Sequence, residues 1–259
     1  PAGRTTSKDA MDEVFLGKLV LLLVAGFVAG IVNTLAGGGS FLTIPALMLY
    51  GMDVSVANGT NRVAVLLQSG TATGIFHKHG KVDLRAIAQI LPINLAGALL
   101  GAWLASIMPT DTFEIVFGLI FIGMTIVMIA KRKLMLAAER EPIRATWLTQ
   151  IVFFAVGFYG VFIQAGVGLL ILLGMSLCMG KELVQSNGAK VALAFLFTVP
   201  ALAIFAWQGQ VLWVPGLVLA VGNVAGAIVG AKLAIKKGNK LIMGAVVVVM
   251  LATAVKLLW

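Results

Sequence analysis

The sequence of 259 residues contains one cysteine, Cys178, and two histidines, His77 and His79. These residues are too few and too far apart to form a disulfide or a cysteine–histidine metal site, so no metal ligands are predicted. The sequence also lacks a phosphate-binding glycine loop and a recognisable nucleophile–base set. Neither an enzyme nor an ATP-driven pump is therefore expected, and no catalytic residue and no cofactor is predicted.

Charged residues are scarce, at 11% of the chain, and only ten of them are acidic. All ten lie in the N-terminal tail, in loops between apolar segments or at segment ends, and none lies in the middle of an apolar segment. Cation transporters and many proton-coupled carriers need a carboxylate buried in the membrane. The absence of one argues against a metal ion or sodium as cargo.

Apolar residues make up 60% of the chain, and the mean hydropathy is +1.05. Long, continuous apolar runs bounded by short charged loops predict an all-α polytopic membrane protein. The runs cover residues 14–35, 40–50, 54–76, 84–106, 113–130, 146–163, 166–179, 184–207, 214–235 and 240–258. Residues 1–13 are predicted as a polar N-terminal tail.

Two of these runs, 40–50 and 166–179, are too short to cross a bilayer comfortably, and each follows a glycine-rich break. The first break is Gly37-Gly38-Gly39-Ser40, and the second contains Gln164, Gly166 and Gly168. The backbone N–H groups freed at such a break favour negative charge, which predicts an anion site. The alternative is that the glycines only allow helices to pack closely.

The two breaks belong to an internal repeat, because residues separated by 129 positions match over more than sixty residues. Gly37 aligns with Gly166, Gly39 with Gly168, and the pair Asn58-Gly59 with Asn187-Gly188. The expected boundary is the basic linker 131–145. It separates a first transmembrane repeat, 14–130, from a second one, 146–259.

Lysine and arginine gather in loops 77–85 and 236–240 and in the linker, which the positive-inside rule places in the cytoplasm. Loops 107–112 and 208–213 contain none and are placed outside. Equivalent loops of the two repeats therefore lie on opposite sides of the membrane. This pattern predicts two inverted-topology repeats, each a broken helical hairpin plus three transmembrane helices.

Each repeat also carries an amide and a cation near the start of a crossing helix. The first has Asn58, Asn61 and Arg62, and the second has Asn187 and Lys190. A charge in a membrane helix is a functional candidate, and arginine can grip an oxyanion with several donors at once. The alternative is that both cations extend to the nearby lipid headgroups. Substrate-binding residues are predicted at Gly37, Gly38, Gly39, Ser40, Asn58, Asn61, Arg62, Gln164, Gly166, Gly168, Asn187 and Lys190.

These motifs resemble those of one transporter family. Leu35-Ala36-Gly37-Gly38-Gly39-Ser40 and Ala57-Asn58-Gly59-Thr60-Asn61-Arg62 are similar to the signature of the TauE/SafE sulfite exporter family. Gln164-Ala165-Gly166-Val167-Gly168 and Asn187-Gly188-Ala189-Lys190 are similar to that family's second repeat. The resemblance covers nearly all of the chain after the tail. It implies export of sulfite or a related organosulfur anion across the bacterial inner membrane.

The sequence therefore predicts a multi-pass secondary transporter of the inner membrane that exports sulfite or a related small organosulfur anion by alternating access. Three alternatives stay open: an importer of an organosulfonate or thiosulfate, an anion channel, and a membrane scaffold that transports nothing. The expected partners are a small sulfur-containing anion and membrane lipid. A homodimer is allowed, and the net charge of +9 gives no indication of nucleic-acid binding, because lipid headgroups explain the basic loops.

Overall fold

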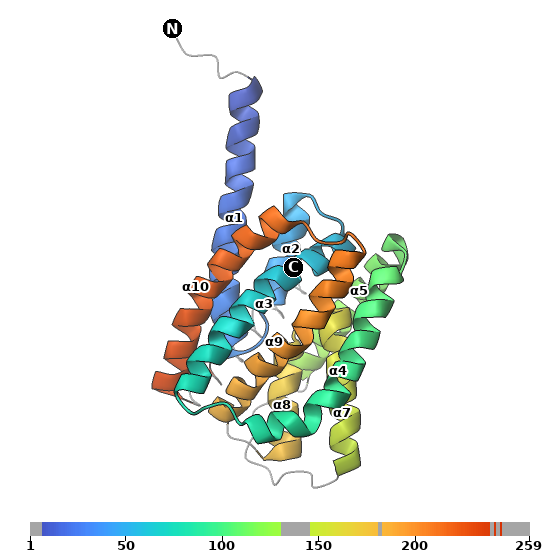
Figure 1. The fold of residues 1–259 in the computed structure, drawn as a ribbon. Helices are drawn as coiled ribbons and strands as arrows, with labels where there is room; N and C mark the ends of the chain where they lie inside the picture. The colour runs from blue at the N-terminus through green and yellow to red at the C-terminus, as the bar shows by residue number, and fades with distance from the viewer. Residues whose placement is uncertain (1–6, 131–145, 181–182, 239–240, 242–243, 245–259) are drawn as a thin grey trace.

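The computed structural model describes residues 7–130, 146–180 and 183–238, together with 241 and 244, and the regular structure of these residues is entirely α-helical. The all-α prediction is confirmed for this part of the chain. The predicted linker 131–145 lies outside the described residues, as does the last predicted crossing, 240–258, apart from two positions. The helices (Figure 1) are α1 (Ser7–Leu35), α2 (Ser40–Tyr50), α3 (Val54–Lys78), α4 (Leu84–Ile107), α5 (Thr110–Ala130), α7 (Thr146–Phe162), α8 (Val167–Met179), α9 (Leu183–Trp207) and α10 (Trp213–Lys237).

Within the described residues, four helical stretches are long and apolar enough to cross a membrane. They are Phe15–Leu35, Leu84–Ile107, Val184–Trp207 and Trp213–Lys237. Helices α3 and α5, which were also predicted to cross, have 25 and 21 residues but are not among the four. In α3, buried polar side chains, Arg62 and Gln68 among them, lower the hydropathy. The chain is a membrane protein whose central helix is more polar than its neighbours.

Both glycine-rich breaks join two helices that fold back on one another. In the first hairpin, Gly39 packs against Ala29, while Lys18 Nζ, nearer the middle of α1, donates to the carbonyl of Tyr50 at the end of α2 at 2.9 Å. In the second, Gly174 on α8 packs against the ring of Phe153 on α7. The two predicted broken hairpins are therefore formed by α1–α2 and α7–α8.

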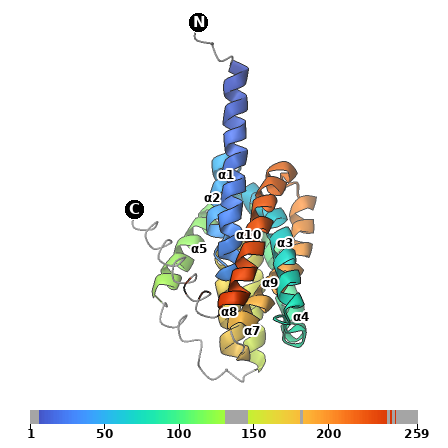
Figure 2. The same cartoon turned by 90° about the vertical axis from the view of Figure 1, so that its left-hand side faces the viewer.

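Helix α1 is longer than the apolar run that predicted it, because it begins at Ser7, inside the expected polar tail 1–13. Alanine, methionine and glutamate between Ser7 and Val14 are good helix formers, so the helix continues past the apolar residues. Its N-terminal turns extend beyond the rest of the bundle, as Figure 1 and Figure 2 show.

Glycines let the first helix of each hairpin contact a helix of the other half of the chain. Helix α1 runs along α10 (Figure 2), where Gly226 lies directly against the carbonyl of Phe27. Helix α7 packs in the same way on α4, where Gly97 lies against the carbonyl of Phe154. A Cβ atom at either glycine would overlap the neighbouring backbone. Small residues that allow such close approach are typical of helix contacts in membranes.

Gly226→Ala is expected to lower the midpoint of thermal unfolding in detergent, because the added methyl group must push α1 away from α10. Forcing one extra carbon into a tight contact costs about 1–3 kcal/mol. Gly118→Ala on α5 is the matched control, since a Cβ at Gly118 meets nothing within 4 Å. Equal midpoints for the two variants would show that the contact between α1 and α10 adapts without cost.

Helices α3 and α9 lie at the centre and run in opposite directions. The Arg62 guanidinium near the start of α3 lies 5.4 Å from the ring centroid of Phe205, near the end of α9. Further along, Gly70 packs against the ring of Phe195. This antiparallel pair carries most of the buried polar side chains and places them beside both glycine-rich breaks.

Candidate functional site

The two glycine-rich breaks contact each other in the middle of the molecule. Gly37 and Gly168 approach so closely that a Cβ on either would overlap the main chain of the other. Gly37 also has a φ of 86°, a left-handed conformation that side chains rarely adopt. The sequence predicted two breaks but not their contact. This contact requires glycine at both positions.

The second break holds a non-glycine residue in the same left-handed region, Gln164, with a φ of 69°. That conformation costs roughly 1–2 kcal/mol for a residue with a side chain. The buried side chain accepts a hydrogen bond from Asn61 Nδ2 on α3 at 2.8 Å, and this bond holds the carboxamide in place. Gly166, with a φ of 76°, completes the turn into α8.

The predicted alignment of the breaks is wrong by two residues. Helices α1 and α7 end at Leu35 and Phe162, which are 127 positions apart, whereas the glycines after α2 and α8, Gly51 and Gly180, are 129 apart. Gly37 therefore corresponds to Gln164 rather than to Gly166. The difference arises because α8 has 13 residues and α2 has 11.

Arg62 is fully buried and binds the end of α7. Its Nη1 donates to the carbonyl of Gly160 at 3.0 Å, and its Nη2 donates to the carbonyl of Val161 and to Asn58 Oδ1. Asn58 Nδ2 in turn donates to the carbonyl of Phe162 at 3.2 Å. The last carbonyls of a helix have no partner within it, so Arg62 and Asn58 satisfy those of α7.

Lys190 binds the end of α1 in the same manner. Its Nζ donates to the carbonyls of Asn33 at 2.9 Å and Thr34 at 3.0 Å. These two carbonyls lie 127 positions before the two that Arg62 binds, and both pairs lie at the end of the first helix of a hairpin. Asn187, one turn before Lys190, is fully buried, and neither polar atom of its side chain has a partner within the described residues.

The sequence did not predict that these two cations bind helix ends. The one feature of the sequence that points to such binding is that neither α1 nor α7 carries a basic residue in its own last turn. Buried carbonyls at such helix ends need a donor from elsewhere in the fold. Neither Arg62 nor Lys190 extends to the surface, because 0% and 2% of their respective areas are exposed. The alternative that they reach the lipid headgroups does not hold for this structure.

A cavity of about 20 Å³ lies between the two breaks, α3 and α9. This volume accommodates about one water molecule. Polar lining comes from Asn33, Ser40, Gln68, Ser69, Gln164 and Lys190, and the remaining lining from Val65, Val167, Gly168, Ile171, Val191, Ala194 and Phe197. No carboxylate is among these lining residues.

Only part of the predicted site reaches this cavity. Four of the twelve predicted residues line it, namely Ser40, Gln164, Gly168 and Lys190. The others stand behind the lining or elsewhere in the breaks and helices, namely Gly37, Gly38, Gly39, Asn58, Asn61, Arg62, Gly166 and Asn187. Three polar lining residues were missing from the prediction, namely Asn33, Gln68 and Ser69.

Two of the three residues that the prediction lacked, Asn33 and Gln68, form a hydrogen-bond network around the end of α1. Asn33 Nδ2 donates to Gln68 Oε1 at 2.8 Å, and Gln68 Nε2 donates to Thr34 Oγ1 at 2.9 Å. Ser69 donates to the backbone of its own helix. Gln68 is an amide in the middle of an apolar run, and this position could have indicated a site residue. The sequence alone does not distinguish such a residue from an amide that only bonds neighbouring helices.

Comparison with known proteins agrees with a transport function. Residues 22–257 match the family model described as "Sulfite exporter TauE/SafE". A "Probable membrane transporter protein ORF9" from Sinorhizobium sp is 31% identical over 96% of this chain and 95% of its own length. Proteins described as probable membrane transporters from Haemophilus influenzae and Escherichia coli K12, the latter named YfcA, are each 28% identical over at least 94% of both chains. No solved structure matches the chain significantly.

Proposed function

Since the chain belongs to the sulfite exporter TauE/SafE family and is a membrane transporter of that type, we propose that it exports sulfite or a related small organosulfur anion. The observation that carries this proposal is the donor-rich cavity at the meeting point of the two breaks, with Lys190 in its lining and no carboxylate. Such a lining favours an anion over a cation.

Three hydrogen-bond donors at the cavity are free to bind the anion's oxygens. Lys190 has three N–H groups and uses two of them on helix α1. Gln164 uses its carboxamide oxygen for Asn61, which leaves its NH₂ group. Ser40 Oγ accepts from Asn61 at 3.5 Å and keeps its own O–H. Three donors and one positive charge suit the three oxygens of a sulfite or sulfonate group.

Arg62 contributes to the same site without contacting the anion in this conformation. Its guanidinium fixes the carbonyls of Gly160 and Val161, which directly precede the second break. Because the break carries Gln164, this contact sets where the Gln164 donor points. The positive charge of Arg62 also offsets part of the negative charge of an anion in the cavity. Two charges interact more strongly in the protein interior than in water, because the interior screens them less.

Alternating access by two inverted repeats, one at 14–130 and one at 146–259, is part of the proposal. It is supported by the antiparallel course of α3 and α9, which occupy equivalent positions in the repeats. It is also supported by reciprocal contacts. Gly59 lies against the carbonyl of Gln210, and Gly188 lies against the carbonyl of Lys81. Gly188 is 129 positions after Gly59, and Gln210 is 129 positions after Lys81. Such reciprocity is expected from a pseudo-twofold axis in the membrane plane.

The size of the cavity fits a closed state of the transport cycle. Space for about one water molecule does not hold a multi-atom anion, so the site must open toward one side of the membrane. The moving elements in this proposal are the hairpins α1–α2 and α7–α8, whose breaks form part of the lining. The proposed location is the bacterial inner membrane, with the basic loops on its cytoplasmic side, as the positive-inside rule suggests.

The proposal is tested by a ligand panel on purified protein. Sulfite, sulfate, thiosulfate, taurine and sulfoacetate are compared by thermal stabilisation, where a ligand at a hundred times its Kd adds about 2.7 kcal/mol. No stabilisation by any of these anions would contradict an anion transporter. Uptake and counterflow in liposomes then distinguish a carrier from a channel, because a channel shows no counterflow, and imposed gradients test export against import.

Lys190→Met is expected to abolish stabilisation by the anion that the wild type binds, because the cavity loses its positive charge. Lys190→Arg is expected to retain part of it. Lys78→Met removes an equal charge from the exposed end of α3 and is the matched control. Unchanged anion binding by Lys190→Met would remove Lys190 from the site.

A further inference from the structure

The two halves of the chain contribute different kinds of lining to the cavity. The first half supplies four polar side chains and one apolar one: Asn33, Ser40, Gln68, Ser69 and Val65. The second half supplies five apolar side chains, here called the apolar wall: Val167, Ile171, Val191, Ala194 and Phe197. Its polar contributions are the two anion donors, Gln164 and Lys190.

This difference occurs at equivalent positions. Gln68 on α3 corresponds to Phe197 on α9, 129 positions later, and both line the cavity. Ser40 and Val167, the first residues of α2 and α8, form a second such pair. In both pairs, the residue of the first repeat is polar and the residue at the equivalent position of the second repeat is apolar. The lining is asymmetric although the backbone around it is repeated.

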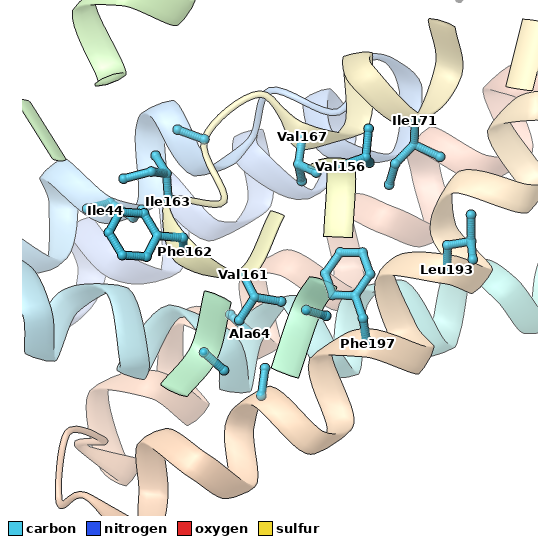
Figure 3. Close-up of a cluster of buried hydrophobic side chains, with 14 of the residues drawn as sticks. Ile44, Ala64, Val156, Val161, Phe162, Ile163, Val167, Ile171, Leu193 and Phe197 are labelled. Carbon is cyan, nitrogen blue, oxygen red and sulfur yellow. The ribbon is translucent and has the colours of Figure 1, made fainter. Parts of the chain in front are cut away.

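Phe197 is the largest member of the apolar wall and is held firmly. It is fully buried, and its Cζ lies 3.4 Å from the position that a Cβ on Gly160 would take. Figure 3 shows its ring rising from α9 toward Val167, with Ile171 on the same side of the cluster. The ring therefore fills the space between the end of α7 and the cavity.

An inorganic oxyanion uses such a lining less well than an anion with an alkyl group. A tetrahedral oxyanion such as sulfate has oxygens on every side, so some of them would face valine, isoleucine and phenylalanine without a donor, and an unpaired buried polar group is costly. Sulfite is pyramidal and can turn its three oxygens to the donors, but it has no carbon to place on the apolar wall. An anion with a short alkyl group can instead place its charged head on the donors and its alkyl carbons on the apolar wall. Burial of each methylene is then favourable.

We propose that Phe197, with the apolar wall, is the specificity-determining element of this site and selects organic anions with a short alkyl group over inorganic oxyanions. The inference rests on the proposed function, because it concerns the same cavity. It depends on the chemistry of the lining rather than on the present volume, since the cavity must enlarge to bind any multi-atom anion. The charged head stays on Lys190, Gln164 and Ser40, as for sulfite.

The test is a homologous series on the purified full chain: sulfite, methanesulfonate, ethanesulfonate and propanesulfonate, with affinities from thermal stabilisation and from competition in liposomes. For the wild type, affinity is expected to rise by about fourfold for each added methylene, the effect of burying one such group. Phe197→Gln, which copies Gln68 into the second repeat, is expected to remove this rise, so that the ratio of the propanesulfonate affinity to the sulfite affinity falls toward one.

Two further variants separate specificity from folding. Phe197→Leu keeps the wall apolar and is expected to keep most of the chain-length dependence. Phe113→Ala removes a fully buried ring from α5, outside the cavity lining, and is expected to lower stability without changing the order of affinities.

Three outcomes would overturn the inference. One is a wild type that binds sulfite more tightly than the alkanesulfonates, and another is a Phe197→Gln variant that weakens all four anions by one factor. In both cases sulfite still binds, and the proposed function stands. The third is a wild type that binds none of the four, which overturns this inference; it overturns the proposed function as well when no anion of the ligand panel stabilises the protein.

Discussion

Arg62→Ala is expected to abolish anion transport while the protein still inserts into the membrane. The substitution removes the donors to the carbonyls of Gly160 and Val161 and to Asn58 Oδ1. Each polar group left buried without a partner costs about 1–3 kcal/mol. The end of α7 then shifts to find other donors, and the second break shifts with it.

The expected loss of transport is large because the second break carries two residues of the cavity lining, Gln164 and Gly168. A displacement of about 1 Å in a positioned group can reduce a rate by roughly a hundredfold. Insertion is expected to be unaffected, because the apolar helices determine it and removal of a charge makes α3 more apolar.

The measurement is sulfite or alkanesulfonate flux in liposomes, normalised to reconstituted protein, with monodispersity in detergent as the check on folding. Arg62→Lys keeps the charge but not the fork of donors, and it is expected to retain a small part of the flux. Arg85→Ala, at an exposed position near the start of α4, is the control for loss of one positive charge. Normal flux through Arg62→Ala would remove Arg62 from the mechanism.

Gly37→Ala is expected to prevent the two breaks from meeting and to eliminate ligand binding. The methyl group would overlap the main chain of Gly168, and the backbone at Gly37, with a φ of 86°, is strained for any residue with a Cβ. The conformational strain alone costs about 1–2 kcal/mol, and the overlap adds to it. The breaks must separate, so the cavity between them loses its shape.

Gly168→Ala separates the two causes. This position has no left-handed backbone, so its methyl group tests the overlap with Gly37 alone. Both variants are expected to lower the thermal unfolding midpoint and to lose anion-induced stabilisation, with the larger loss for Gly37→Ala. Gly74→Ala on α3 is the control, since its Cβ would meet nothing within 4 Å. Wild-type stability and flux for Gly168→Ala would show that contact between the breaks is dispensable.

The sequence predicted the helices well where apolar runs and glycine-rich breaks define them. Both hairpins were expected, and the structure turns the chain at 36–39 and 163–166, close to the predicted breaks. Helix α1 was predicted too short because its first residues are polar yet helix-forming. The alignment of Gly37 with Gly166 was wrong because an ungapped repeat cannot show the two residues by which α8 exceeds α2.

The substrate-binding role of the predicted site residues stays a prediction, and the structure brings only some of them to the cavity. Lys190, Gln164 and Ser40 line it, whereas Arg62 lies behind it and donates to backbone carbonyls. Sequence indicates that a charge inside a membrane helix needs a partner, but it does not identify that partner. The carbonyls that Arg62 binds are almost a hundred residues away, in a helix of the other half.

The amino-acid sequence by itself determined that this chain is a helical membrane protein and that each half carries a glycine-rich break, an amide and a cation, and it predicted that the two halves are related. These properties depend on composition and local pattern, which hydropathy and backbone sterics translate directly into helices and turns. Only the tertiary structure decided which cation reaches the cavity, that the two breaks touch, and that most of the apolar lining of the cavity comes from the second half of the chain. Those facts depend on contacts between distant segments, and such contacts arise when helices from the two halves pack against each other.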